Sequence, residues 1–84
     1  MPRWTPEMQT SELAALRSRQ GITRNDAAHE FKLSLETLRR YENGGVSLPM
    51  EIAEAMTVYY GVAFEDIRKA AREARQGWLA EHPE

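Results

Sequence analysis

Short stretches of apolar residues at helical spacing alternate with glycine, proline and capping residues along most of the chain. Between residues 22 and 44, Ala27, Ala28 and Phe31 gather on one side of a 3.6-residue helix. Thr23 precedes this helix, and its hydroxyl can accept from the orphan N–H groups of the first turn. The pattern therefore predicts a short helix over about residues 24–30, with one face in a core.

A second short helix is predicted directly after the first. Ser34 is its expected N-cap, and Leu38 and Tyr41 lie three residues apart on the face that must turn inward. Gly44 ends the helix, since glycine adopts the left-handed C-cap conformation without steric cost. Helices of about two turns are not stable alone. The flanking segments must therefore supply a scaffold.

The N-terminal flank predicts one helix of this scaffold. Thr5-Pro6-Glu7 is a typical helix start, with a capping residue, a proline at the first helical position and an acid near the positive end of the dipole. The helix is expected to run to about Gln20. Its expected core contacts are Met8, Leu13 and Leu16.

The C-terminal flank predicts two more helices. Pro49 opens one that Gly61 ends, with an inner face made of Ile52, Ala55, Met56 and Tyr59. Only one of the neighbours Tyr59 and Tyr60 can be fully buried. The last helix is expected from Phe64 to about Gln76, with residues after Gly77 frayed. Its apolar stripe either covers the core or, from Ala71 onward, forms a short coiled-coil seam; the stripe consists of Phe64, Ile67, Ala71, Ala74 and Trp78.

These features together resemble the helix-turn-helix domain of the phage repressor and Cro type, also called XRE-like. The resemblance covers about residues 13–67 and rests on Gly21-Ile22-Thr23, Ala28, Ser34, Tyr41-Glu42-Asn43-Gly44, Gly61-Val62 and Glu65-Asp66-Ile67. It implies an all-α fold: a compact five-helix lambda-repressor-like DNA-binding domain with a helical C-terminal extension. We expect the DNA-binding domain over residues 1–67, its motif over about 23–43, and the extension and tail over 68–84. Lys32 departs from the family, which usually has glycine at this left-handed turn.

Composition limits the remaining possibilities. The 84 residues have room for one domain, and the absence of cysteine excludes disulfides and zinc–thiolate sites. The longest charge-free apolar run, residues 55–64, is too short to span a bilayer, and the N-terminus lacks a signal-peptide core. We therefore expect a cytoplasmic protein with no membrane contact.

Catalysis and metal binding are not expected. His29 and His82 lie far apart, and neither has a second histidine or cysteine at ligand spacing. The pair Gly44-Gly45 follows a helix rather than preceding one, so it is not a phosphate-binding loop. The sequence thus predicts no enzyme and no cofactor.

The net charge of −2 is low for a protein that binds nucleic acid, because Lys and Arg contacts to phosphate usually dominate affinity. Residues 1–50 hold seven Lys or Arg and six Asp or Glu, a net +1, whereas residues 51–84 hold four and seven, a net −3. The half that carries the motif is therefore nearly neutral. We expect modest affinity for double-stranded DNA, which improves when a homodimer presents two such faces.

The resemblance places the DNA contacts on and beside the second motif helix. It assigns base contact to Leu35, Glu36 and Arg40, and phosphate contact to Arg24, Ser34, Thr37 and Asn43, while Arg39 is expected to reach phosphate. Side-chain chemistry agrees, since Arg40 can fork onto guanine, Glu36 can accept from cytosine N4, and Leu35 can lie against a thymine methyl. A second interpretation pairs Glu36 with Arg40 at i+4 and leaves neither for DNA.

Two classes of function follow. The first is a sequence-specific DNA-binding transcriptional regulator, a repressor that acts as a homodimer on a palindromic operator. The second is a protein-interaction module, an antitoxin or repressor modulator that binds a toxin or another regulatory protein through its acidic C-terminal half. The second class rests on the −3 charge of that half, on Tyr59, Tyr60 and Trp78, and on the lack of basic residues in the loop at 45–47.

Overall fold

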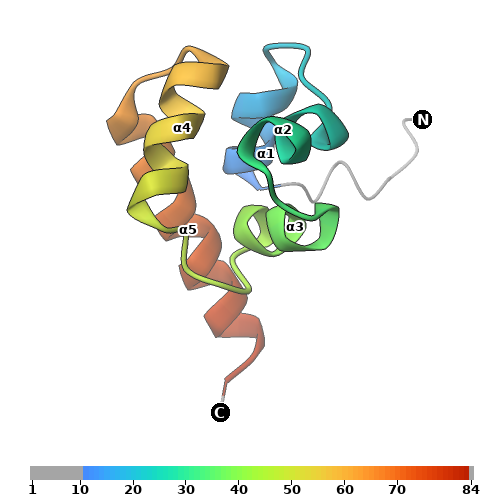
Figure 1. Cartoon of the computed structure of the whole chain (residues 1–84). Coiled ribbons are helices and arrows are strands. Elements are labelled where there is room, and N and C mark those ends of the chain that lie inside the picture. The colour runs from blue at the N-terminus through green and yellow to red at the C-terminus, as the bar shows by residue number, and fades with distance from the viewer. Residues whose placement is uncertain (1–10, 84) are drawn as a thin grey trace, which may run out of the picture.

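Five helices and no strand make up residues 11–83, the part of the chain that the computed structural model describes. They are α1 (Glu12–Ser18), α2 (Arg24–Phe31), α3 (Leu35–Asn43), α4 (Met50–Tyr60) and α5 (Phe64–Glu81), arranged as Figure 1 shows. The all-α, five-helix prediction is therefore confirmed. None of the described helices is long and apolar enough to cross a membrane.

Capping hydroxyls begin the two helices of the motif. The Asp26 N–H donates to Thr23 Oγ1 over 3.0 Å, and the Thr37 N–H donates to Ser34 Oγ over 3.1 Å. Both capping residues have extended backbone conformations, as N-caps require. The predicted starts of these two helices are confirmed.

The first helix does not run unbroken from its predicted start to Gln20. Ser11 is extended and caps α1, accepting from the Ala14 N–H over 3.3 Å, so no helix passes through residue 11. The segment Thr5-Pro6-Glu7 predicted an earlier start because it combines three helix-opening features, and it lies outside the described residues. Ser11 and Glu12 are also a typical helix start, because a capping hydroxyl and an acid precede an apolar run.

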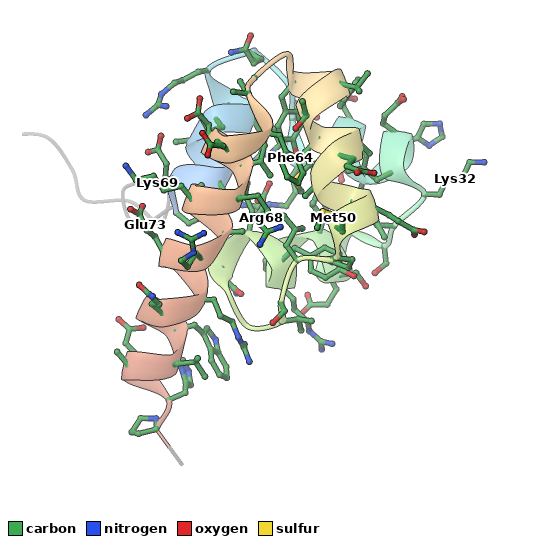
Figure 2. The ribbon with its side chains drawn as sticks, turned by 90° about the vertical axis from the view of Figure 1, so that its left-hand side faces the viewer. Lys32, Met50, Phe64, Arg68, Lys69 and Glu73 are labelled. Atoms are coloured by element: carbon green, nitrogen blue, oxygen red, sulfur yellow. The ribbon has the colours of Figure 1, made fainter. Side chains whose placement is uncertain are left out.

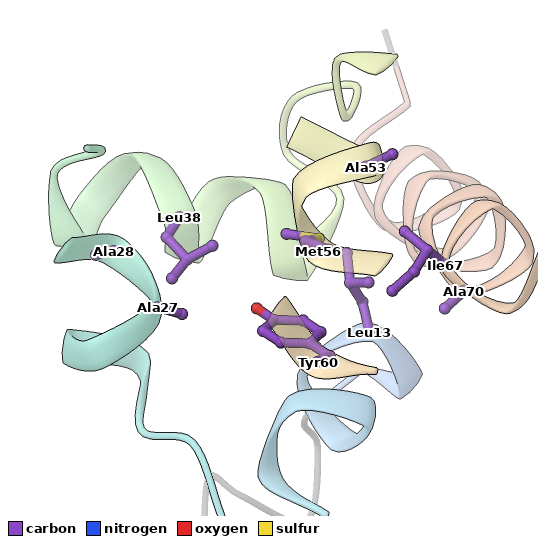
Figure 3. Close-up of a cluster of buried hydrophobic side chains, with 9 residues drawn as sticks. All are labelled: Leu13, Ala27, Ala28, Leu38, Ala53, Met56, Tyr60, Ile67 and Ala70. Atoms are coloured by element: carbon purple, nitrogen blue, oxygen red, sulfur yellow. The ribbon is translucent and has the colours of Figure 1, made fainter. Parts of the chain in front are cut away.

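One buried cluster joins all five helices (Figure 3). Its members are Leu13, Ala27, Ala28, Leu38, Ala53, Met56, Tyr60, Ile67 and Ala70. Phe31 packs against its edge, with ring centroids 5.7 Å from Tyr59 and 5.9 Å from Tyr60. The two neighbouring tyrosines are unequally buried, as expected, but the predicted inner face of α4 is wrong: Ala53, Met56 and Tyr60 are buried, whereas Ile52, Ala55 and Tyr59 are only partly buried. The Tyr60 hydroxyl has no hydrogen-bond partner among the described residues, and burial raises the pKa of its phenol.

The turn between α2 and α3 keeps its left-handed residue although that residue is a lysine. Lys32 has φ 58° and ψ 42°, and it is the one non-glycine residue with positive φ within residues 11–83. The Leu33 N–H reaches back to the Ala28 carbonyl over 2.9 Å, which closes the end of α2. The motif therefore retains its geometry at the cost of backbone strain on the order of 1 kcal/mol.

The last helix is longer than predicted. We expected an end near Gln76 and a frayed tail, whereas α5 continues through Gly77 to Glu81. Trp78 explains the extension, because it lies against the loop after α3 and its indole stacks on the His82 ring at 3.9 Å between centroids. The expected domain boundary between residues 67 and 68 falls inside this continuous helix.

Candidate nucleic-acid interface

The inner face of α3 is anchored by an apolar residue and a carboxylate. Leu38 is fully buried, and Glu42, four residues further on, is only 3% exposed. We had expected Tyr41 to share the inner face with Leu38, but Tyr41 is only partly buried. A spacing of four residues places Glu42 more directly above Leu38 than a spacing of three places Tyr41.

Glu42 is held between two arginines from other helices. Its carboxylate oxygens lie 2.7 Å from Arg17 Nε and 3.0 Å from Arg24 Nε. Arg17 also donates to the Ile22 carbonyl over 2.7 Å, and the Ser11 hydroxyl donates to the Glu42 carbonyl. This network fixes α3 against α1 and α2. Sequence reasoning missed it, although Arg17 lies four residues after the core residue Leu13 and thus on the same face.

The three side chains of α3 to which the resemblance assigns base contact are all exposed. Leu35 is 39% exposed, and the side chains of Glu36 and Arg40 are 54% and 59% exposed. Glu36 and Arg40 belong to the face opposite Leu38 and Glu42, whereas Leu35 is exposed in the first turn of α3, three residues before Leu38. The structure therefore brings Glu36 and Arg40 together on one accessible face, with Leu35 exposed beside it at the start of α3.

Glu36 forms ion pairs on this surface, as the second interpretation of the sequence proposed. Its two carboxylate oxygens lie 3.1 Å from Arg39 Nη1 and 3.4 Å from Arg40 Nε. Exposed pairs of this kind contribute about 0–1 kcal/mol, because water screens both charges. Such a pair can exchange its partner for a base edge at little cost.

The residues assigned to phosphate lie at two places around α3. Ser34 and Thr37 form its N-terminal cap, where the Ser34 hydroxyl also donates to Thr37 Oγ1 over 2.8 Å. Arg24, Arg39 and Asn43 line one groove of about 710 Å³ between α1, α3 and α5. Asn43 already uses its Oδ1 to accept from the Gly45 N–H over 2.9 Å, so its NH₂ is the group left to donate outward.

An element that the sequence did not predict borders the outer face. Glu36, Arg40 and Asn43 line a hollow of about 370 Å³ whose other wall includes Val46 and Trp78. Trp78 comes from α5, whose last turns continue beyond α3 in Figure 1. Among residues 11–83, no three His, Asp or Glu side chains are placed to hold a metal ion.

The fold and this surface define a class: small all-α proteins that present one helix outward on a helix-turn-helix platform. Residues 11–71 match the family model described as a helix-turn-helix domain, and the chain belongs to that family. No curated protein matches the chain, and no solved structure does. In helix-turn-helix domains the second motif helix, here α3, enters the major groove of DNA. The family and the exposed outer face together indicate a DNA-binding regulator.

Proposed function

We propose that the protein is a sequence-specific transcriptional repressor that binds a palindromic operator as a homodimer. One observation carries the proposal: Glu36 and Arg40 are exposed together on α3, Leu35 is exposed at its start, and the face opposite Glu36 and Arg40 is fixed by the buried carboxylate of Glu42. A rigid helix with adaptable polar side chains on its outer face suits the reading of base edges. Repression follows when the bound protein occupies a promoter.

Each of the three outer residues has a matching base. The Arg40 guanidinium can donate two parallel hydrogen bonds to O6 and N7 of guanine, and the Glu36 carboxylate can accept from N4 of cytosine. Leu35 can contact the methyl group of thymine. Ser34, Thr37, Arg39, Asn43 and Arg24 then fix the register of the helix through phosphate contacts.

Charge supports the homodimer. The segment of residues 1–50 has a net charge of only +1 by its composition, so one copy neutralises few phosphates. Two linked copies make the second binding event intramolecular and raise the apparent affinity without new contacts. The two half-sites of the operator are then expected about one helical turn, roughly 34 Å, apart.

A matched pair of variants on α3 tests the base-reading role. Arg39 and Arg40 are neighbours, both exposed and both paired with Glu36, so each replacement by alanine removes one charge and one ion pair. The operator is first obtained by selection from a random duplex library, and affinities are measured by fluorescence anisotropy. Arg40→Ala should lose about 1–3 kcal/mol of discrimination at one base pair, whereas Arg39→Ala should weaken binding to all sequences alike.

The results that contradict the proposal are distinct. Equal losses on every sequence for both variants would remove Arg40 from base recognition. Failure of the wild-type protein to bind any duplex at 50 mM salt would remove the DNA-binding function. Sedimentation of the protein with and without the selected operator tests the homodimer, which requires two copies on one duplex.

A protein-interaction module is the second candidate. The observation that favours it is an apolar groove of about 560 Å³ between α2 and α4, lined by Phe31, Ile52, Ala55, Val58 and Tyr59 together with Glu30 and Lys32. Val58, one of the lining residues, is 83% exposed. Co-purification of a toxin or regulator that Val58→Glu abolishes, combined with negligible DNA binding, would support this candidate over the first.

A further inference from the structure

Three arginines follow one side of α5. Arg68, Arg72 and Arg75 have the spacing i, i+4, i+7, which aligns them along the helix. With Ser47, Leu48 and Met50 they line a groove of about 390 Å³ between α5 and the segment that joins α3 to α4. Figure 2 shows Arg68 directed toward Met50, while Lys69 and Glu73 lie on the other side of α5.

These three arginines differ from the others in the described part of the chain. Residues 11–83 contain eight arginines, and the ion pairs within that part involve the other five: Arg17, Arg19, Arg24, Arg39 and Arg40. The groove lining holds no carboxylate. Arg68, Arg72 and Arg75 therefore form no ion pair with the described residues, although the chain as a whole has a net charge of −2.

Neutral groups hold two of the guanidinium groups in place. Arg75 Nη1 donates to the Gly44 carbonyl over 2.8 Å, and the same guanidinium lies 5.7 Å from the centre of the Trp78 ring. Arg68 lies 5.8 Å from the centre of the Phe64 ring, with Nη1 3.8 Å from Met50 Sδ. Contacts of this kind orient an arginine and leave its charge available for an anion.

The arginine groove is fixed beside the end of α3. Gly44 is the C-cap of α3, and the backbone of α5 approaches it so closely that a Cβ at Gly44 would lie 2.1 Å from the Ala74 carbonyl oxygen. Loop residues 45–47 contain no Lys or Arg. The loop after α3 therefore carries no positive charge, and the nearby positive charge comes from the arginines of α5.

We propose that Arg68, Arg72 and Arg75 bind the sugar–phosphate backbone of the same duplex whose bases α3 reads. The inference rests on the proposed DNA-binding function and extends it to α5. Guanidinium groups fork onto phosphate oxygens and release the counterions that surround DNA. The groove thereby supplies affinity that does not depend on sequence. Its phosphate contacts position α3 on the duplex and do not select bases.

The double variant Arg68→Gln/Arg72→Gln tests the inference. It keeps Arg75 and its hydrogen bond to the Gly44 carbonyl. Its matched control is Arg19→Gln/Lys69→Gln. This control also removes two positive charges, but from a different groove that contains Glu12, Asp66 and Glu73. Binding of each protein to a fluorescein-labelled random 20-base-pair duplex is measured by anisotropy from 50 to 200 mM NaCl. Thermal unfolding followed by circular dichroism verifies that both variants are folded.

The double variant should reduce the slope of log K against log salt concentration by about 1.8, since each phosphate contact contributes about 0.9. Its loss of affinity should then be about tenfold larger at 50 mM than at 200 mM salt. The control should keep the wild-type slope. These results would support a phosphate-binding groove on α5.

Other outcomes overturn the inference, and they separate it from the proposed function. An unchanged slope in the double variant, with firm wild-type binding, rejects the groove and leaves DNA binding by α3 intact. Equal losses in both variant pairs attribute the effect to net charge and reject the groove as well. A wild-type protein that binds no duplex, including one that binds vesicles of anionic phospholipid instead, rejects both proposals.

Discussion

Two glutamates on α3 have the same kind of partner and opposite surroundings. Glu42 on the inner face lies between Arg17 and Arg24, and Glu36 on the outer face lies between Arg39 and Arg40. The exposed fraction of the side chain is 3% for Glu42 and 54% for Glu36. They are six positions apart on one helix of nine residues.

The difference in burial gives the two groups different tasks. Breaking a buried pair leaves an uncompensated charge away from water and costs several kcal/mol. Breaking an exposed pair costs little, because water takes the place of the lost partner. The inner network therefore maintains the architecture, while the outer one can release its arginines to DNA.

The largest expected effect comes from neutralising the inner carboxylate. Glu42→Gln keeps the shape of the side chain but leaves the guanidinium of Arg17, a residue only 6% exposed, without its counter-charge. We expect a loss of about 3–5 kcal/mol in the free energy of unfolding, measured by urea titration with circular dichroism. A loss below about 1 kcal/mol would contradict the contrast between the two faces.

The next effect concerns the attachment of α3 to α5. Gly21 and Gly44 have similar positive φ, 76° and 86°, but only Gly44 lacks room for a side chain. Gly21→Ala should cost about 1–2 kcal/mol from backbone strain alone. Gly44→Ala should cost about 1–3 kcal/mol more, because the Ala74 carbonyl must move away. Equal melting temperatures for the two variants would show that the close approach is unimportant.

A smaller effect, of opposite sign, is expected at the turn that sets α3 on α2. Lys32→Gly relieves the left-handed strain and should stabilise the protein by about 1 kcal/mol. Urea titration measures the gain, and the exposed Lys69→Gly, inside α5, is a control that should destabilise by a similar amount. A loss of stability in Lys32→Gly would mean that the lysine side chain makes a favourable contact there.

The smallest effect on stability is expected on the outer face. Glu36→Gln should change the free energy of unfolding by no more than about 0.5 kcal/mol. It should also release Arg39 and Arg40 and remove one negative charge from the interface, which should tighten binding to random duplex about twofold. Weaker binding to random duplex would show instead that the carboxylate positions its arginines for phosphate contact.

Sequence reasoning succeeded where a structural feature depends on nearby residues. Thr23 and Ser34 cap their helices through contacts three residues away, and Gly44 and Gly61 end theirs with positive φ, so a short window contains the whole cause. The same window shows which side of α3 is apolar. The exposure of Glu36 and Arg40 could therefore be predicted, whereas the assignment of Leu35 came from the family resemblance.

The remaining features depend on residues far apart in the chain. The pair of Arg17 with Glu42 joins positions 25 residues apart, and the bond from Arg75 to Gly44 joins positions 31 apart. No pattern within a short window of sequence indicates contacts between residues so far apart in the chain. The true end of α5 was missed for the same reason, because Trp78 lies against a loop more than 30 positions earlier in the chain.

Trp78 gives the protein an intrinsic optical reporter. Its indole forms part of the wall of the hollow that Glu36 and Arg40 also line, and the chain contains two tryptophans in total. With Trp4 replaced by phenylalanine, and with excitation at the long-wavelength edge where tyrosine does not absorb, the emission comes from Trp78 alone. A duplex that enters the hollow displaces water from the indole or stacks a base near it, and either event changes the intensity without any attached dye.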